Sequence, residues 1–253
     1  MGRYDGYLLM SDFDGTLAWN GTISRENCEA IRYFQAEGGL FSVASGRFRK
    51  WLRNWEEYIL PNTWCAMLNG ALICDRTGEN VVYRQPMDDD FLQVAREVMA
   101  ACPHLRGVRL VDYEKYVEWK QGEPLDLSEL LLPGYKMVFL TPTEYSDAYK
   151  EQIMQMLPAR YFAMRSWING IEVQTRGTGK GAAVHRMRAL LGDRIHTVVA
   201  AGDYENDLAM IQEADIGYAV GDAIESLKAA ADRITVPACE HAIARIIEEI
   251  GSK

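Results

Sequence analysis

Short apolar runs alternate with amphipathic stretches over the first third of the chain. Tyr7–Ser11, Leu40–Ala44 and Trp64–Leu68 each have the length and composition of a strand that is buried on both faces. Between the first two runs, Ser24 can cap a helix that extends to about Glu37, where two glycines end it. A further helix is expected between the second and third runs. Polar residues or glycine follow each run, and this pattern is typical of a parallel sheet with ligands at the carboxyl ends of its strands.

The same alternation returns in the last third of the chain. Strands are predicted at 196–201 and 216–220, and helices at 179–191, from about 206, at 223–231 and at 240–250. Because strands and helices alternate at both ends of the chain, the two ends together predict one α/β core with a parallel sheet.

The middle of the chain has a different pattern. Strands are expected at 81–84, 108–111, 116–119, 135–140, 161–165 and 170–175, helices at 88–101 and 144–157, and a loop at 121–133. Neighbouring strands with interspersed helices are typical of a smaller α+β unit. The sequence therefore predicts two domains: an α/β core of residues 1–80 and 176–253, and an inserted α+β domain of residues 81–175.

The composition narrows the range of functions. Apolar residues make up 48% of the 253 residues and charged residues 25%, as in ordinary globular proteins. With 27 basic and 36 acidic residues the net charge is −9, which argues against a general affinity for nucleic acid or anionic membranes. No apolar run has the length of a membrane span, and the N-terminal residues lack the features of a signal peptide. We therefore expect a cytoplasmic protein that binds neither nucleic acid nor membrane.

Two aspartates follow the first predicted strand, in the stretch MSDFDGTL (residues 10–17). In an extended chain Asp12 and Asp14 point to the same face, so their carboxylates can converge on one site. A divalent cation would relieve their mutual repulsion, and closely placed carboxylates suit Mg²⁺. An EF-hand is excluded, because Leu17 and Ile23 stand where its glycine and its last glutamate should be. On these two residues alone, a structural pair of turn aspartates remains an alternative, since Asp-Gly is common in turns.

Two further clusters lie where a predicted helix begins. Ser45 and Gly46 can offer a hydroxyl and backbone N–H groups to an oxyanion at the start of the following helix. Lys180 stands at the first turn of a helix, where the helix dipole disfavours a cation. A lysine in this position therefore suggests that it meets an anion. The segment is not a Walker loop, because Gln174 replaces the first glycine and Gly181 follows the lysine.

A fourth cluster, GDYEND (residues 202–207), follows the strand predicted at 196–201. Asp203 is placed to bind a metal, and Asn206 or Asp207 would lie one helical turn further on. An acidic helix cap can explain one of these residues, but it does not explain the whole cluster.

DFDGT, SGR, a lysine that begins a helix, and GDYEND occur in this order along the chain. In type and order they resemble the four motifs of the haloacid dehalogenase superfamily of phosphotransferases. The long segment between Ser45 and Lys180 resembles the Cof-like branch, subclass IIB, which carries its cap domain between the second and third motifs. The resemblance implies a Rossmann-like core with an inserted α+β cap of the C2B type. The inserted segment matches this branch in position and element pattern, not in its residues.

The resemblance also implies a role for each motif residue. Asp12 corresponds to the nucleophile that forms an aspartyl-phosphate, and Asp14 corresponds to the general acid and base. Mg²⁺ would be bound by Asp12, by the backbone carbonyl of Asp14 and by Asp203. Phosphate would be bound by Ser45, Gly46, Lys180 and Asn206. Lys180 would in addition help to keep Asp12 ionised and so belongs with the catalytic residues.

Three residues keep open roles at this point. Asp207 could support Lys180 or a metal-bound water, and Arg47 could contact phosphate or only brace its loop. Asp222 stands where many relatives have asparagine, and it could contact the substrate.

The implied function is a Mg²⁺-dependent phosphatase of small phosphorylated metabolites, with sugar phosphates as the favoured class. One alternative is a phosphosugar mutase, which passes the phosphoryl group back to a sugar hydroxyl. Another is a regulatory protein that binds a phosphometabolite without turning it over, although this class would be expected to lose the catalytic side chains that are present here. We expect a monomer or a homodimer.

Overall fold

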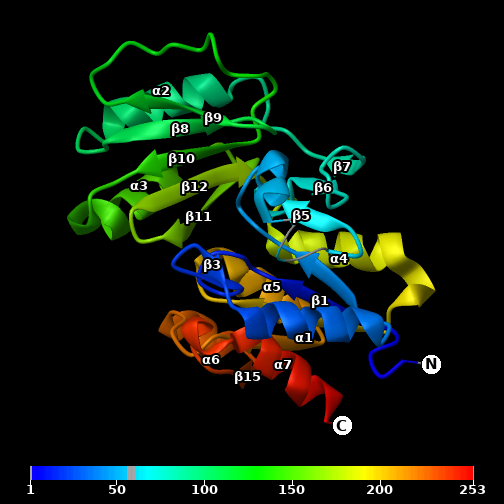
Figure 1. Cartoon of the computed structure of the whole chain (residues 1–253). Coiled ribbons are helices and arrows are strands. Elements are labelled where there is room, and N and C mark those ends of the chain that lie inside the picture. The colour runs from blue at the N-terminus through cyan, green and yellow to red at the C-terminus, as the bar shows by residue number, and fades with distance from the viewer. Residues whose placement is uncertain (1, 56–57, 59–60, 253) are drawn as a thin grey trace. The chain divides into compact units, whose positions relative to one another are not determined.

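The computed structural model describes residues 2–55, 58 and 61–252 (Figure 1). They form two compact units: a core unit, Met1–Tyr83 with Gly179–Lys253, and an inserted unit, Arg84–Thr178. Both divisions lie a few residues beyond the positions expected from the sequence. At the first division the reason is β7 (Val81–Arg84), which continues the sheet next to β6 (Leu72–Cys74) and so begins within the core unit.

The core unit is built on a five-stranded parallel sheet with the strand order β15-β14-β13-β1-β4. The strands are β1 (Tyr7–Ser11), β4 (Leu40–Val43), β13 (Thr197–Gly202), β14 (Ile216–Ala219) and β15 (Arg233–Ile234). Ser11 pairs in register with Ala201 on one side and with Val43 on the other. β13, β1 and β4 therefore end at the same edge of the sheet, and the polar residues that follow them are brought together.

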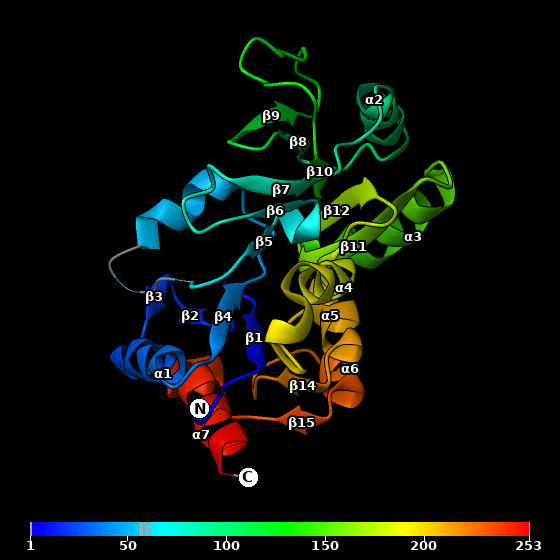
Figure 2. The same ribbon diagram turned by 90° about the vertical axis from the view of Figure 1, so that its right-hand side faces the viewer.

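Two layers of helices cover this sheet (Figure 2). One face carries α1 (Arg25–Ala36) and α7 (Ala242–Gly251), and the other carries α4 (Lys180–Leu191), α5 (Leu208–Glu213) and α6 (Glu225–Ala230). Burial on both faces explains why the strands read as continuous apolar runs. Helix α1 begins where the sequence predicts it, because the Ser24 side chain accepts a hydrogen bond of 3.2 Å from the Asn27 backbone N–H.

Shorter elements complete the core unit. They are the hairpin β2 (Ala18–Trp19) and β3 (Thr22–Ile23), the sheet of β5 (Cys65–Met67), β6 and β7, and the 3₁₀-helices η1 (Arg49–Trp55), η2 (Leu68–Gly70), η4 (Gly192–Arg194), η5 (Glu205–Asp207) and η6 (Ala238–Glu240). The helix expected before the third strand is η1. Strands β6 and β15 were not expected.

The inserted unit is an antiparallel sheet covered by helices. Its strand order is β11-β12-β10-β8-β9. The elements are α2 (Phe91–Ala101), β8 (Gly107–Val111), β9 (Tyr116–Lys120), β10 (Lys136–Leu140), η3 (Thr143–Tyr145), α3 (Ser146–Met156), β11 (Tyr161–Trp167) and β12 (Gly170–Thr175). Apolar side chains of α2, α3 and the sheet form a core of their own. The expected loop at 121–133 contains neither helix nor strand.

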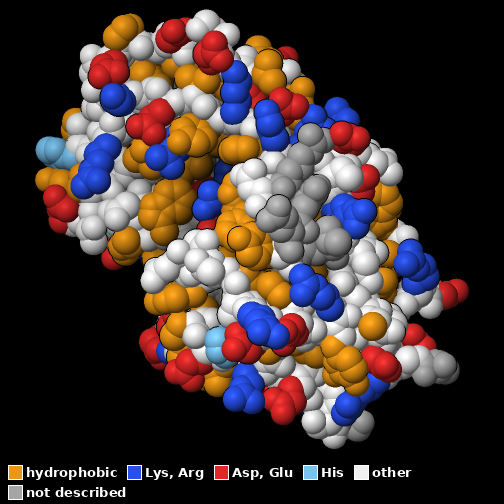
Figure 3. Space-filling view, viewed as in Figure 1, with side chains coloured by type: hydrophobic (Ala, Val, Ile, Leu, Met, Phe, Trp, Pro, Cys, Tyr) orange, Lys and Arg blue, Asp and Glu red, His pale blue; other side chains and the backbone are white. Residues whose placement is uncertain are grey.

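The surface carries charges of both signs. Figure 3 shows acidic and basic side chains interspersed over the face in view, with apolar side chains between them. No helix in the described part of the chain is both long enough and apolar enough to cross a lipid bilayer.

Candidate active site

The ends of β1 and β13 bring acidic residues from distant parts of the sequence together. Asp12 directly follows β1, and its backbone N–H donates to the Ala201 carbonyl of β13 at 2.9 Å. Asp203 directly follows β13. Asp207 lies in the short 3₁₀-helix after it, and carboxylate oxygens of Asp12, Asp203 and Asp207 lie within 4.8 Å of one another. Two of these three residues were predicted as metal ligands.

Lys180, the first residue of α4, lies against two of these acids. Its Nζ donates to Asp12 Oδ1 at 2.5 Å and to Asp207 Oδ1 at 2.6 Å. The side chains of Lys180 and Asp207 are completely buried. A buried ammonium at the start of a helix is tolerated here because two carboxylates compensate its charge. The sequence predicted that Lys180 meets an anion. In the structure, carboxylates of the protein itself take this place.

Asp207 braces the site from within. While its Oδ1 accepts the hydrogen bond from Lys180, its Oδ2 accepts hydrogen bonds from the backbone N–H groups of Asp203 (3.0 Å) and Tyr204 (3.2 Å). Of the two roles considered for Asp207, contact with Lys180 is the one that the structure contains. Because both of its oxygens are engaged, Asp12 and Asp203 are the better placed carboxylates for a cation.

The pKa values of Asp12, Asp203 and Lys180 reflect how closely these charged groups lie together. Burial raises the pKa of Asp12 to about 7, with the charge of Lys180 acting against it and that of Asp207 adding to it. Burial and the charges of Asp12 and Asp207 raise the pKa of Asp203 to about 9. Burial by itself would lower the pKa of Lys180, but the two carboxylates outweigh it and the pKa is raised. Lys180 is therefore an ammonium, and the raised pKa values of Asp12 and Asp203 reflect that three ionised acids would carry more negative charge than one ammonium can balance.

A divalent cation fits this imbalance. Carboxylate oxygens are the ligands that Mg²⁺ prefers, and the oxygens of Asp12 and Asp203 already lie close together. Gly15, at φ +82°, passes so near that a Cβ on it would lie 2.5 Å from Asp203 Oδ2. The peptide between Asp14 and Gly15, which contains the Asp14 carbonyl, therefore runs beside Asp203. The two carboxylates expected to bind the metal thus lie close together, with this peptide beside Asp203.

The side chain of Asp14 is held apart from this cluster. Arg47 makes a two-pronged ion pair with it, from Nε to Oδ2 at 2.9 Å and from Nη2 to Oδ1 at 2.8 Å. The guanidinium also lies over the ring of Trp51, 4.7 Å from its centre. Of the two roles considered for Arg47, the contact found is with the predicted acid and base. Both side chains remain about half exposed, so the pair can open to a ligand.

Ser45 and Gly46 offer hydrogen-bond donors next to these acids. The Ser45 hydroxyl accepts a bond from the Arg47 N–H at 3.2 Å, which leaves its own hydrogen to donate. The Gly46 N–H has no acceptor among the described residues. The α-helix expected to start here is absent, because the chain bends and enters η1 only at Arg49. The oxyanion donors are thus loop donors, without an α-helix dipole behind them.

Asn206 is positioned by a residue that sequence reasoning did not place in the site. Its Nδ2 donates to Oδ1 of Asn69 at 3.3 Å, and the Asn69 N–H donates to the Ser45 carbonyl at 2.9 Å. Asn69 is fully buried with φ +50°, a conformation that asparagine tolerates better than most residues. The signal was available, since Asn69-Gly70 ends the third predicted strand as the other clusters end theirs.

The structure also gives contacts for Thr16 and Asp222. Thr16, fully buried, donates from Oγ1 to Asp203 Oδ1 at 3.3 Å, a contact that the sequence did not predict although Thr16 belongs to DFDGT. Asp222 accepts a hydrogen bond from the Ala238 N–H at 3.0 Å through Oδ1. The contact found for Asp222 thus joins two loops of the core unit.

Comparison with known proteins agrees with this geometry. The chain matches haloacid dehalogenase-like hydrolases over residues 9–247. It belongs to this family. The predicted motifs Asp12, Ser45, Lys180 and Asp203 all lie inside the matched region.

Individual relatives in this family cover almost the whole chain. The putative phosphatase YxeH of Bacillus subtilis is 31% identical over 96% of this chain and 97% of its own length. The 5-amino-6-(5-phospho-D-ribitylamino)uracil phosphatase YcsE of the same bacterium is 28% identical, over 95% and 94%. The solved structure of the subclass IIB sugar phosphatase BT4131 superposes with a TM-score of 0.79 at 21% identity and covers 96% of this chain and 98% of that one. The last likeness confirms the predicted fold class, a Rossmann-like core with an inserted α+β domain.

Proposed function

We propose that this haloacid dehalogenase-like hydrolase is a Mg²⁺-dependent phosphatase that acts on a small phosphorylated metabolite through an aspartyl-phosphate. The family and its named relatives support the enzyme class, a phosphoric monoester hydrolase. The observation that carries the finer proposal is the buried group of Asp12, Lys180 and Asp207 beside Asp203. In this proposal Asp12 is the nucleophile, Lys180 is the fixed cation, and Asp12 with Asp203 forms the metal site, all within this one cluster.

The metal would be held by Asp12, Asp203 and the Asp14 carbonyl. Bound there, Mg²⁺ would offset the negative charge of the phosphate and of the attacking carboxylate. The protein needs such a charge, because Lys180 alone faces three acids before any phosphate arrives. Lys180, the Ser45 hydroxyl and the Gly46 N–H would then bind phosphate oxygens, with Asn206 held by Asn69 next to them.

The chemistry would proceed in two steps at phosphorus. In the first, a carboxylate oxygen of Asp12 forms a bond to phosphorus, the ester P–O bond breaks, and Asp14 gives a proton to the leaving oxygen. In the second, Asp14 takes a proton from water, the water oxygen attacks phosphorus, and the bond to Asp12 breaks. Inorganic phosphate leaves and both aspartates return to their initial states. Arg47 would hold Asp14 in place between the two proton transfers.

Substitution of Asp12 tests the chemistry directly. Asp12→Asn should lower the Mg²⁺-dependent hydrolysis of p-nitrophenyl phosphate by at least about 1,000-fold, because the covalent route is lost. EDTA should abolish wild-type turnover, and added Mg²⁺ should restore it. Asp193→Asn, a matched change at an exposed position, should leave the rate unchanged. The proposal is wrong if the folded wild type shows no metal-dependent turnover, or if Asp12→Asn retains it.

The substrate class rests on relatives and not on contacts. Two Bacillus subtilis relatives are named for a phosphoribityl-aminouracil and one solved neighbour for sugar phosphates. All of these carry a phosphate ester on a polyhydroxylated carbon chain. We therefore expect sugar and sugar-alcohol phosphates to give the highest kcat/KM in a screen at fixed Mg²⁺. The same screen separates hydrolysis from a mutase, since a mutase would yield an isomeric sugar phosphate in place of free phosphate.

A further inference from the structure

An open cavity lies in the core unit, away from the acidic cluster. Its volume is about 560 Å³, within the usual range for a small-molecule site. Its walls come from the segment that leads into β5, from the turn after β6 and from η4. Cys65 pairs with Cys74 across β5 and β6, which places Trp64 beside Asp75 and so forms one wall of the cavity.

This cavity and the proposed active site lie at opposite ends of the sheet. Arg194, on the cavity wall, precedes β13, whereas Asp203 directly follows that strand. Six residues of strand span roughly 20 Å. A ligand in the cavity therefore does not touch the acidic cluster.

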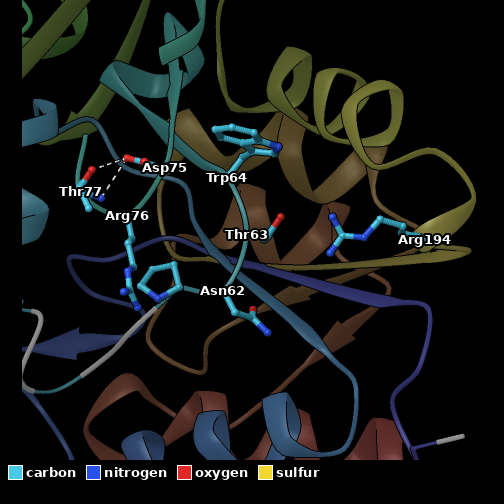
Figure 4. A pocket seen from close by; sticks show the side chains of 8 residues that line it. Asn62, Thr63, Trp64, Asp75, Arg76, Thr77 and Arg194 are labelled. Carbon is cyan, nitrogen blue, oxygen red and sulfur yellow. Dashed lines mark hydrogen bonds between the residues drawn. The ribbon is translucent and has the colours of Figure 1, made fainter. Parts of the chain in front are cut away.

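The polar groups of the cavity fall into two sets. One set is engaged within the protein: Asp75 accepts hydrogen bonds from the backbone and side chain of Thr77, and Asn62 bonds to the backbone of Phe41 and Gly39. These contacts shape the walls. The dashed lines in Figure 4 show the pair formed by Asp75 and Thr77.

The other set consists of two arginine side chains that have no partner within the described part of the chain. Arg76 and Arg194 line the cavity and make no ion pair or hydrogen bond with any described residue. Figure 4 shows them on opposite sides of the segment that carries Thr63, with Arg194 extending toward Thr63. In a chain with net charge −9, these two guanidiniums concentrate positive charge on one cavity, with no acidic partner among the described residues. Guanidinium groups bind phosphate and carboxylate through paired hydrogen bonds.

We propose that this cavity binds a small metabolite with an anionic group at each end, a bisphosphate or a dicarboxylate. Because the two arginines are separated by the Thr63 segment, each takes one anionic group. The indole of Trp64, which packs against the core, offers apolar surface to the chain between them. The site is independent of the proposed phosphatase reaction and would persist if that function were wrong.

Binding can be measured with probes that the enzyme does not hydrolyse. Hexane-1,6-bisphosphonate, adipate and hexylphosphonate would be titrated into the ¹⁵N-labelled full chain in buffer freed of divalent cations. The backbone N–H signals of Thr63 and Arg194 and the Trp64 indole signal report the cavity, and those of Ser45 and Gly46 report the acidic cluster. We expect saturable shifts of the cavity signals with one or both two-ended probes, and binding at least ten-fold weaker with hexylphosphonate. The bisphosphonate and adipate arms decide between phosphate and carboxylate.

The two arginines provide the decisive variant. Arg76→Gln/Arg194→Gln should weaken binding at least ten-fold, whereas Arg25→Gln/Arg245→Gln removes the same charge from exposed positions and should not. Thermal unfolding should be unchanged in the first variant, since neither arginine side chain makes an ion pair or hydrogen bond with a residue that the structure describes. The proposal is overturned if the cavity signals do not saturate, if the one-ended probe binds as tightly, or if the cavity variant binds like wild type.

Discussion

At the scale of single residues, the site is a problem in charge balance. Asp12, Asp203 and Asp207 converge on one ammonium, that of Lys180, in a largely buried setting. A buried ion pair contributes little net stability, but loss of one partner leaves an uncompensated charge. Lys180 is therefore needed for the fold of this edge as well as for the chemistry proposed there.

Replacement of Lys180 should lower the free energy of unfolding more than replacement of an ordinary surface lysine does. Lys180→Met leaves the buried Asp207 without its ion-pair partner, and it should lower the free energy of unfolding by about 3–5 kcal/mol. Lys228→Met, which breaks an exposed pair with Glu225, should cost at most about 1 kcal/mol. Urea unfolding of both variants at pH 8 in EDTA measures the difference. Equal effects of the two substitutions would contradict the assigned burial of the Lys180 charge.

At the scale of elements, the sequence predicted the structure best where burial is continuous. β1, β4 and β13 are buried and mainly apolar runs followed by polar residues, and the residues at their ends are those predicted for the site. β6 and β15 are only three and two residues long, too short for a repeating pattern of apolar and polar residues to reveal them. Their pairing depends on neighbours that a single sequence does not reveal.

The contacts that turns make could not be predicted from the sequence either. Asn69 reaches Asn206 because the chain turns through positive φ at Leu68, Asn69 and Gly70. Local residue patterns indicate that a turn occurs there, but not which side chain it directs inward. For the same reason the helix expected after Ser45 was wrong in kind, since the segment is a 3₁₀-helix that starts several residues later.

The turn at η2 also fixes the start of α4, which a substitution can test. Gly70 has φ +83°, and a Cβ there would lie 2.6 Å from the Gly179 carbonyl oxygen, directly before Lys180. Gly70→Ala should cost about 2–4 kcal/mol of unfolding free energy, from backbone strain together with displacement of α4. It should also lower the phosphatase rate, because Lys180 moves with the helix.

Gly21→Ala is the matched control for this prediction. Gly21 has a similar φ of +72°, but a Cβ there would meet nothing within 4 Å. Gly21→Ala should show only the cost of backbone strain, about 1–2 kcal/mol of unfolding free energy, and its phosphatase rate should be unchanged. Chemical denaturation and steady-state kinetics on both variants give the comparison. If Gly70→Ala behaves like Gly21→Ala in both measurements, the turn does not position α4.

At the scale of the whole molecule, the two units have separate hydrophobic cores, and the acidic cluster lies entirely in one of them. Binding of a metal should therefore stabilise the core unit without a direct effect on the inserted unit. Calorimetry can follow both, and hydrogen exchange can assign the protected segments to one unit or the other.

The dependence of this stabilisation on pH has a definite sign. The pKa values of Asp12 and Asp203 are raised to about 7 and about 9 in the folded protein, so without metal the folded state binds protons more tightly than the unfolded state. The contribution of these two aspartates to the stability of the metal-free core unit is then greatest below the ordinary aspartate pKa and falls as the pH rises toward 9. Mg²⁺ competes with those protons, so its stabilising effect should grow over the same interval.

The upward shift in the unfolding temperature of the core unit on addition of Mg²⁺ should therefore be larger at pH 8 than at pH 5. Asp203→Asn should reduce both the shift and its pH dependence, because it removes one ligand and one of the crowded charges. Asp193→Asn, exposed and remote from the cluster, should change neither. A Mg²⁺ effect of the same size at both pH values, or one that survives Asp203→Asn, would mean that the cation binds elsewhere. The charge imbalance at the strand ends would then need another partner, and an anionic substrate could not supply it.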